Sequence, residues 1–137
     1  MRIPPCMATL RRLAGGSRPG PGALTNSPPQ VAEAQLTNAG LRGYVEQALS
    51  ADAVRRLKPA PAPYHMAAKR LGVPPGAIRL IGAHAWDVAG ALRAGCAAAF
   101  VARPGKVLDP LVERPDVVGA DLRAVADQIL AREVPGR

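Results

Sequence analysis

Residues 78–92 read IRLIGAHAWDVAGAL, and this stretch decides the fold class. An apolar run at 78–81 passes through a short turn into a helix of small residues, which we expect at 86–94. A buried strand that leads directly into a helix is typical of α/β proteins. In such proteins ligands bind beyond the carboxyl ends of the strands, which is where His84 and Asp87 lie.

The rest of the chain continues this alternation of strands and helices. Strands are expected at 23–26, 46–51, 78–81, 98–102 and 117–118, and helices at 30–39, 61–71, 86–94 and 121–131. This order predicts a parallel sheet with helices on both faces. We expect a domain at 23–131, a tail at 132–137, and an irregular or disordered segment at 1–22, where pairs of Pro and Gly recur.

The composition limits the classes of protein and partner. The chain of 137 residues is 48% hydrophobic but only 3% aromatic, which predicts one domain with an aliphatic core. Its net charge is +8, yet the basic residues are scattered, so we expect no nucleic-acid partner. No apolar stretch is long enough for a membrane span, and Cys6 and Cys96 lack metal-ligand spacing. We therefore expect a cytoplasmic protein with no membrane partner.

Polar residues follow the expected strands at several points. Thr25 and Asn26 follow the first, Lys58 lies in a loop, and His84 and Asp87 follow the strand at 78–81. Each has an ordinary explanation, such as a helix N-cap for 25–27, a solvated charge for Lys58 and a favourable helix dipole for Asp87. Together they suit an anionic substrate or a covalent ester intermediate, because a Lys neutralises a nucleophilic carboxylate and a hydroxyl or amide donates to developing charge.

Taken in order, three motifs resemble those of the haloacid dehalogenase superfamily. They are LTNS at 24–27, RRLKP at 55–59 followed by Tyr64, and HAWD at 84–87. The resemblance is to the type II (L-)2-haloacid dehalogenases and covers about 23–131. It implies a three-layer, Rossmann-like α/β core. It also implies a reaction in which an Asp carboxylate attacks carbon 2 of a short 2-haloacid and water hydrolyses the resulting ester.

The resemblance also implies roles for individual residues. The implied catalytic residues are Lys58, Asp87 and Thr25, and the implied substrate-binding residues are Asn26, Tyr64, His84 and Trp86. Lys58 would stabilise the charge of the nucleophile, and Asp87 would hold Lys58. Phosphatases of the superfamily carry Gly-Asp-x-x-x-Asp, whereas here Ala83 follows Gly82, and loss of a hard oxygen ligand disfavours Mg²⁺. We thus expect no metal and no cofactor, with a phosphatase as a further alternative.

Two parts of the family pattern are absent from this sequence. The nucleophile belongs to a first strand with the pattern Asp-x-x-x-Thr, but no acid precedes Glu33, and no cap domain separates the first two motifs. We expect the C-terminal half of a dehalogenase-like protein, truncated or inactive in this form, with the central strand of its sheet missing. The neighbouring strand edges would then be unpaired. The alternative is a non-catalytic module whose edges pair with another chain, as a homodimer or with a complementing chain.

Overall fold

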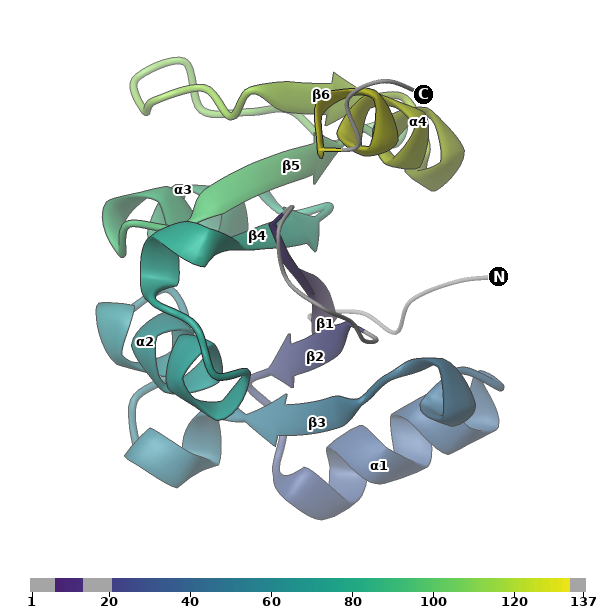
Figure 1. Cartoon of the computed structure of the whole chain (residues 1–137), viewed down its shortest axis with the longest axis vertical. Helices are drawn as coiled ribbons and strands as arrows, with labels where there is room; N and C mark the ends of the chain where they lie inside the picture. The colour runs from purple at the N-terminus through teal and green to yellow at the C-terminus, as the bar shows by residue number, and fades with distance from the viewer. Residues whose placement is uncertain (1–6, 14–20, 134–137) are drawn as a thin grey trace.

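Six strands form one sheet in the order β3-β2-β1-β4-β5-β6, within the residues that the computed structural model describes, 7–13 and 21–133 (Figure 1). The strands are β1 (Met7–Arg12), β2 (Gly22–Thr25), β3 (Gln47–Ser50), β4 (Ile78–Gly82), β5 (Ala97–Val101) and β6 (Val117–Gly119). All of them except β1 run in one direction, and β1 is antiparallel to both of its neighbours. The expected α/β class is confirmed, and the sheet is mixed rather than wholly parallel.

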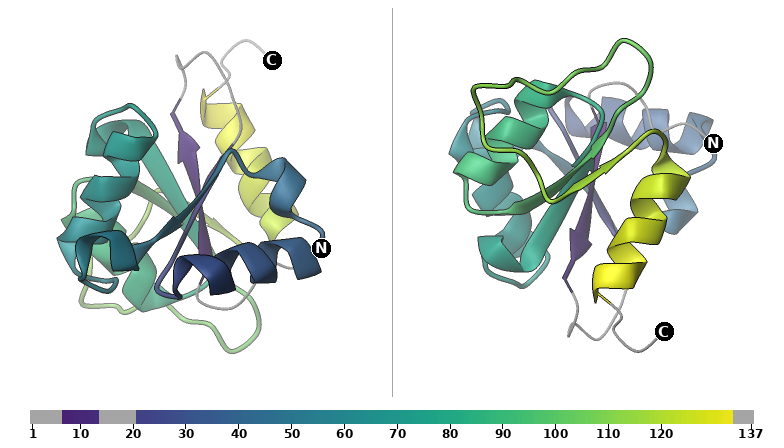
Figure 2. Two further views of the ribbon diagram at one scale, coloured as in Figure 1. Left: turned by 90° about the horizontal axis from the view of Figure 1, so that it is seen from below. Right: turned by 90° about the horizontal axis from the view of Figure 1, so that it is seen from above.

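Four helices cover the two faces of this sheet. They are α1 (Pro29–Asn38), α2 (Pro61–Arg70), α3 (Ala85–Arg93) and α4 (Leu122–Glu133), with short 3₁₀ helices η1 (Arg42–Tyr44), η2 (Ala51–Val54) and η3 (Pro75–Ala77) between them. Helices α2 and α3 pack on one face, and α1 and α4 pack on the other (Figure 2). None of the helices in the described ranges has the length and hydrophobicity needed to cross a bilayer.

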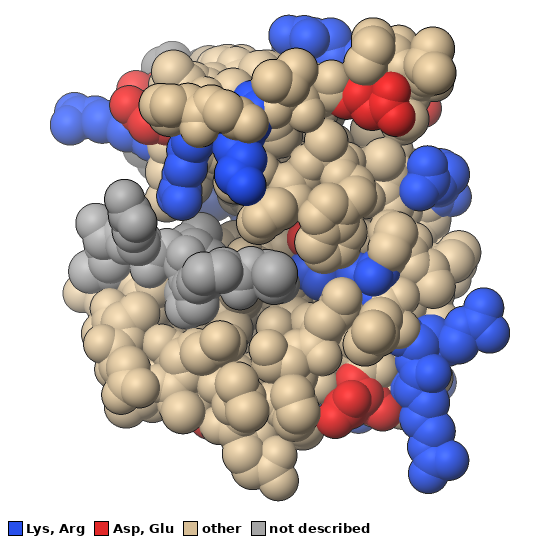
Figure 3. Space-filling model, turned by 180° about the vertical axis from the view of Figure 1, so that it is seen from behind, with Lys and Arg blue, Asp and Glu red and all other residues tan. Residues whose placement is uncertain are grey.

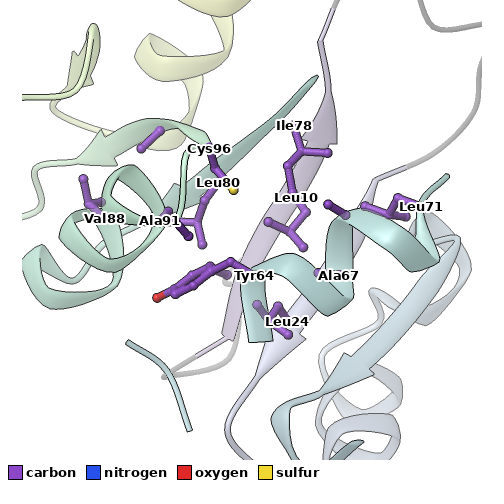
Figure 4. Packing of buried hydrophobic residues seen from close by; sticks show 14 of the residues in the cluster. Leu10, Leu24, Tyr64, Ala67, Leu71, Ile78, Leu80, Val88, Ala91 and Cys96 are labelled. Atoms are coloured by element: carbon purple, nitrogen blue, oxygen red, sulfur yellow. The ribbon is translucent and has the colours of Figure 1, made fainter. Parts of the chain in front are cut away.

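The main core lies between the sheet and helices α2 and α3. Alanines from both helices and from β5 let the layers approach closely, because Ala adds little bulk beyond the backbone. Figure 4 shows the Tyr64 ring among Leu10, Leu24 and Ala91, with its hydroxyl oxygen at the edge of the cluster. A polar hydroxyl at the end of a fully buried ring needs a hydrogen-bond partner, and this requirement leads directly to the site described below.

The N-terminal segment corrects one expectation. Residues 7–12 form β1 and occupy the central position that was expected to be vacant, within a segment expected to be irregular. Leu10 lies opposite Gly22 on one side and Leu80 on the other. The physical reason is that the edges of β2 and β4 need backbone hydrogen-bond partners, which β1 supplies. The inner edges of β2 and β4 are therefore paired within the chain, by β1. Residues 1–6, 14–20 and 134–137 lie outside the described part of the chain.

The other expected elements are present. Every strand and helix expected between residues 23 and 131 begins and ends within two residues of its expected bounds. Helix α4 continues to Glu133, two residues beyond its expected end. The carboxyl ends of β2 and β4 lie at the same edge of the sheet, on either side of β1. This edge is where the segments after β2, β4 and η2 meet.

Candidate active site

Lys58 and Asp87 form a buried ion pair at this edge. Lys58 lies in the loop between η2 and α2, and Asp87 lies in the first turn of α3, directly after β4. The Lys58 Nζ donates to Asp87 Oδ2 at 2.7 Å and to the Leu24 carbonyl oxygen at 3.1 Å. The exposed fractions of the two side chains are 0% and 3%. With so little contact with solvent, the attraction between these charges is only weakly screened.

The second Asp87 oxygen accepts a hydrogen bond from Tyr64. The Tyr64 hydroxyl lies 2.6 Å from Asp87 Oδ1 and 3.2 Å from the Asp87 carbonyl oxygen. Burial raises the pKa of Tyr64 well above its ordinary value of 10.0, and the charge and hydrogen bond of Asp87 raise it further. Tyr64 is therefore a neutral donor, and each carboxylate oxygen of Asp87 has a partner within the protein.

Asn26 binds the backbone of Lys58. Its Oδ1 accepts from the Lys58 backbone N–H at 2.7 Å, and its Nδ2 donates to the Lys58 carbonyl oxygen at 3.3 Å. Thr25 is almost fully buried, and its Oγ1 accepts from the Ser27 backbone N–H at 3.1 Å. Thr25 lies opposite Met7 of β1. The structure thus places Asn26 with Lys58, while the Thr25 hydroxyl bonds within its own turn.

His84 and Trp86 lie at the start of α3. The Trp86 ring centroid is 5.6 Å from that of His84 and 5.7 Å from the Lys58 Nζ, a distance at which a ring face attracts a cation. His84 and Arg103 line a small cavity of about 50 Å³ together with Met7 and Gly82. Burial lowers the pKa of His84 below its ordinary 6.5, and the charge of Lys106 lowers it further.

The sequence interpretation gave no structural role to two glycines near the site, Gly82 and Gly90. A Cβ placed on Gly82 would lie 3.9 Å from both the Ala8 Cβ and Asp87 Oδ2, so β1 passes beside the ion pair. Gly90 of α3 faces Pro59 and Tyr64. The sequence signal for Gly90 is that a glycine lies within an expected helix. Such a glycine often marks a close approach of two backbones.

The charges elsewhere are dispersed. On the face shown in Figure 3, the Lys and Arg side chains stand singly or in small adjoining groups, with uncharged surface between the groups. Among the described residues, no three His, Cys, Asp or Glu side chains lie close enough together to hold a metal ion. Among the ion pairs of the described residues, that of Lys58 and Asp87 has both side chains almost fully buried.

Comparison with known proteins identifies the family. The sequence profile of the family described as haloacid dehalogenase-like hydrolase matches residues 3–95, which is more than half of the chain. The chain belongs to this family. Its three motifs at 24–27, 55–59 and 84–87 fall within the matched range.

Individual relatives and solved structures agree with this assignment. The (S)-2-haloacid dehalogenase of Pseudomonas sp. (strain YL) is 35% identical over 104 residues, which are 76% of this chain and 45% of the relative. The crystal structure of the L-2-haloacid dehalogenase RSc1362 matches with a TM-score of 0.73 at 34% identity, covering 78% of this chain and 47% of that one. An L-2-haloacid dehalogenase from Xanthobacter autotrophicus, with chloropropionic acid covalently bound, matches with a TM-score of 0.70 at 27% identity, covering 79% and 53%.

The coverage of these relatives is partial. The chain spans about half the length of the curated relatives it matches. The family match begins at residue 3, before the expected start of the similarity at about 23, and so it includes β1. The fold and the cluster of Lys58, Tyr64 and Asp87 are thus present in a family member that covers about half of these dehalogenases.

Proposed function

We propose that this chain is part of a 2-haloacid dehalogenase. It contributes the part of the active site that is formed by Lys58, Tyr64 and Asp87. The single observation that carries the proposal is the Lys58 ammonium, held by Asp87 with no side-chain exposure at the carboxyl edge of the sheet. A cation in this place stabilises a nearby carboxylate in its charged, nucleophilic form.

The reaction proceeds in two steps. A carboxylate oxygen attacks carbon 2 of the haloacid, a carbon–oxygen bond forms, and the halide leaves with the electron pair of the carbon–halogen bond. Water then attacks the carbonyl carbon of the ester, which releases the 2-hydroxy acid, a proton and the original carboxylate. Covalently bound chloropropionic acid in the Xanthobacter autotrophicus relative supports such an intermediate.

The residues of this chain act on the carboxylate and its surroundings. Lys58 stabilises the nucleophile before attack and after hydrolysis, and Asp87 orients the Lys58 ammonium. Tyr64 fixes Asp87 by donating to its other oxygen. Trp86 and His84, beside Lys58 and the cavity, contribute to the substrate pocket. Thr25 provides its hydroxyl at the end of β2, where it can donate to the bound acid.

Ala8 is the residue of β1 that lies beside Gly82, next to the Asp87 side chain. No acid precedes Glu33 in the sequence, and the Ala8 side chain points to the face of the sheet that holds Leu10 and Tyr64. The Ala8 Cβ and Asp87 Oδ2 both lie within 3.9 Å of the space beside Gly82. Position 8 is therefore where we place a carboxylate to test the proposal.

A phosphatase reaction is less well supported by this geometry. A Mg²⁺ ion in such a site needs several free oxygen ligands. Both side-chain oxygens of Asp87 instead accept hydrogen bonds from Lys58 and Tyr64, and Ala83 stands where the phosphatases have their other acid. This arrangement favours the dehalogenase reaction.

The test is to introduce a carboxylate at position 8 and to measure chloride release from (S)-2-chloropropionate. We expect Ala8→Asp to release chloride above the background of the unchanged chain. Thr9→Asp is the matched control, because successive strand residues face opposite sides of the sheet. Adding Lys58→Met to Ala8→Asp should abolish the gain. A folded Ala8→Asp variant that releases no more chloride than Thr9→Asp would contradict the proposal.

A further inference from the structure

Gly90 lies where α3 comes closest to the Lys58 loop. It is a buried residue in the interior of α3, where glycine is normally unfavourable because of its backbone freedom. A Cβ at this position would lie 2.6 Å from the Pro59 Cβ, 2.7 Å from the Tyr64 hydroxyl and 3.0 Å from the Pro59 carbonyl oxygen. Such distances are far below van der Waals contact, so any side chain at Gly90 forces Pro59 or Tyr64 to move.

Asn26 holds the same loop from the opposite side. Its amide contacts both the N–H and the carbonyl oxygen of Lys58, which fixes the backbone of that residue relative to the end of β2. The residue that follows Lys58 is Pro59, the one that packs on Gly90. The backbone of 58–59 is therefore held between β2 and α3, and α3 also carries Asp87, the partner of Lys58.

We propose that Gly90 and Asn26 are positioning residues that hold the Lys58 loop against α3, so that the Lys58 Nζ reaches Asp87. Their catalytic importance rests on the function proposed above for Lys58. Their effect on the position of Lys58 does not depend on that function, and it can be measured without an assay of enzyme activity.

The experiment measures the acetylation rate of each lysine in the folded protein. The chain has three lysines, and Lys69 and Lys106 are exposed whereas Lys58 is buried. Limited treatment with an acetylating reagent, followed by peptide mass spectrometry, gives a rate for each. We expect Lys58 to react at least about tenfold more slowly than Lys69 in the unchanged chain, since reaction requires local opening.

The variants separate positioning from general stability. Gly90→Ala should raise the Lys58 rate about tenfold while the Lys69 rate stays constant, because the loop is displaced from α3. Gly43→Ala is the matched control, since a Cβ there meets no atom within 4 Å. Asn26→Ala should also raise the Lys58 rate, and Asn26→Asp should do so less, because it keeps the acceptor for the Lys58 N–H.

Two results would overturn the proposal. One is a Lys58 rate equal to that of Lys69 in the unchanged chain. The other is a Gly90→Ala variant with native circular dichroism and an unchanged Lys58 rate. If Gly90→Ala does not fold, the Asn26 variants decide in the same way, with Asn38→Ala as an exposed control. Chloride release plays no part in these readouts, so failure of the proposed reaction would leave them intact.

Discussion

Among the described residues, the buried cations Lys58 and Arg79 lie at opposite edges of the sheet, and their partners differ. Lys58 lies at the carboxyl edge, where its partner Asp87 is 3% exposed. Arg79 lies near the amino end of β4, where its partner Asp116 is 48% exposed and also within 3.6 Å of Arg132. One ion pair is enclosed by protein, whereas the other opens to solvent.

This difference in exposure distinguishes the proposed active-site pair, Lys58 and Asp87, from the structural pair, Arg79 and Asp116. Enclosing two charges carries a desolvation cost that an apolar pair of the same size would avoid, so the pair of Lys58 and Asp87 is poorly explained by stability alone. The Arg79 pair needs no such explanation, because water solvates the Asp116 carboxylate. Its hydrogen bond from Arg79 lowers the pKa of Asp116 below the ordinary value of 3.8.

The largest expected effect comes from removing the enclosed cation. Lys58→Met leaves the Asp87 carboxylate buried without its charged partner, and we expect the free energy of unfolding to fall by about 3–5 kcal/mol. Urea unfolding followed by circular dichroism measures this change. The double variant Lys58→Met/Asp87→Asn should recover part of the loss, because the uncompensated charge is then gone. A loss below about 1 kcal/mol would indicate a solvated pair.

The next largest effect tests whether the Tyr64 hydroxyl stabilises the Asp87 carboxylate. Tyr64→Phe removes the hydroxyl that bonds Asp87 Oδ1 and leaves that buried oxygen without this donor, which should cost about 1–3 kcal/mol in unfolding free energy. Tyr44→Phe, at an exposed position, is the matched control and should be close to neutral. Equal effects of the two substitutions would show that the Tyr64 hydroxyl does not support Asp87.

The smallest effect belongs to the pair of Arg79 and Asp116, whose carboxylate is half exposed. Arg79→Met should cost about 1 kcal/mol, since Asp116 remains solvated and the main loss is the hydrogen bond to the Ala98 carbonyl oxygen. The pKa of Asp116 is lowered in the folded state, so its contribution is present above pH 3.8 and is lost as the pH falls through the lower folded value. The cost of Arg79→Met should therefore shrink in acid, which unfolding at pH 7 and at pH 3 can test.

The sequence predicted most elements of the fold, for identifiable reasons. Apolar runs such as 78–81 and small-residue helices such as 86–94 carry strong local patterns, and both were found within two residues of their expected bounds. Strand β1 has no such pattern, because MATLRR mixes small, polar and basic residues between proline and glycine pairs. It is a strand because β2 and β4 need backbone partners, which is a property of the assembled sheet.

The site shows the same division. The cluster of Lys58, Tyr64 and Asp87 was predicted through motif resemblance, and the structure brings these three together, although their roles stay predictions. The contact of Asn26 with the Lys58 backbone was not predicted, because it depends on where a loop 32 residues away returns to β2. The sequence also could not show that Pro59 and Tyr64 pack against Gly90.

The most direct test of the enclosed ion pair is a ¹⁵N nuclear magnetic resonance spectrum of the lysine ammonium groups at neutral pH. Exposed ammonium protons exchange rapidly with water, whereas a buried, hydrogen-bonded group is protected. The structure predicts a protected signal that disappears in Lys58→Met and persists in Lys69→Met. A spectrum in which no ammonium signal depends on Lys58 would contradict the account, because Lys58 would then be open to solvent.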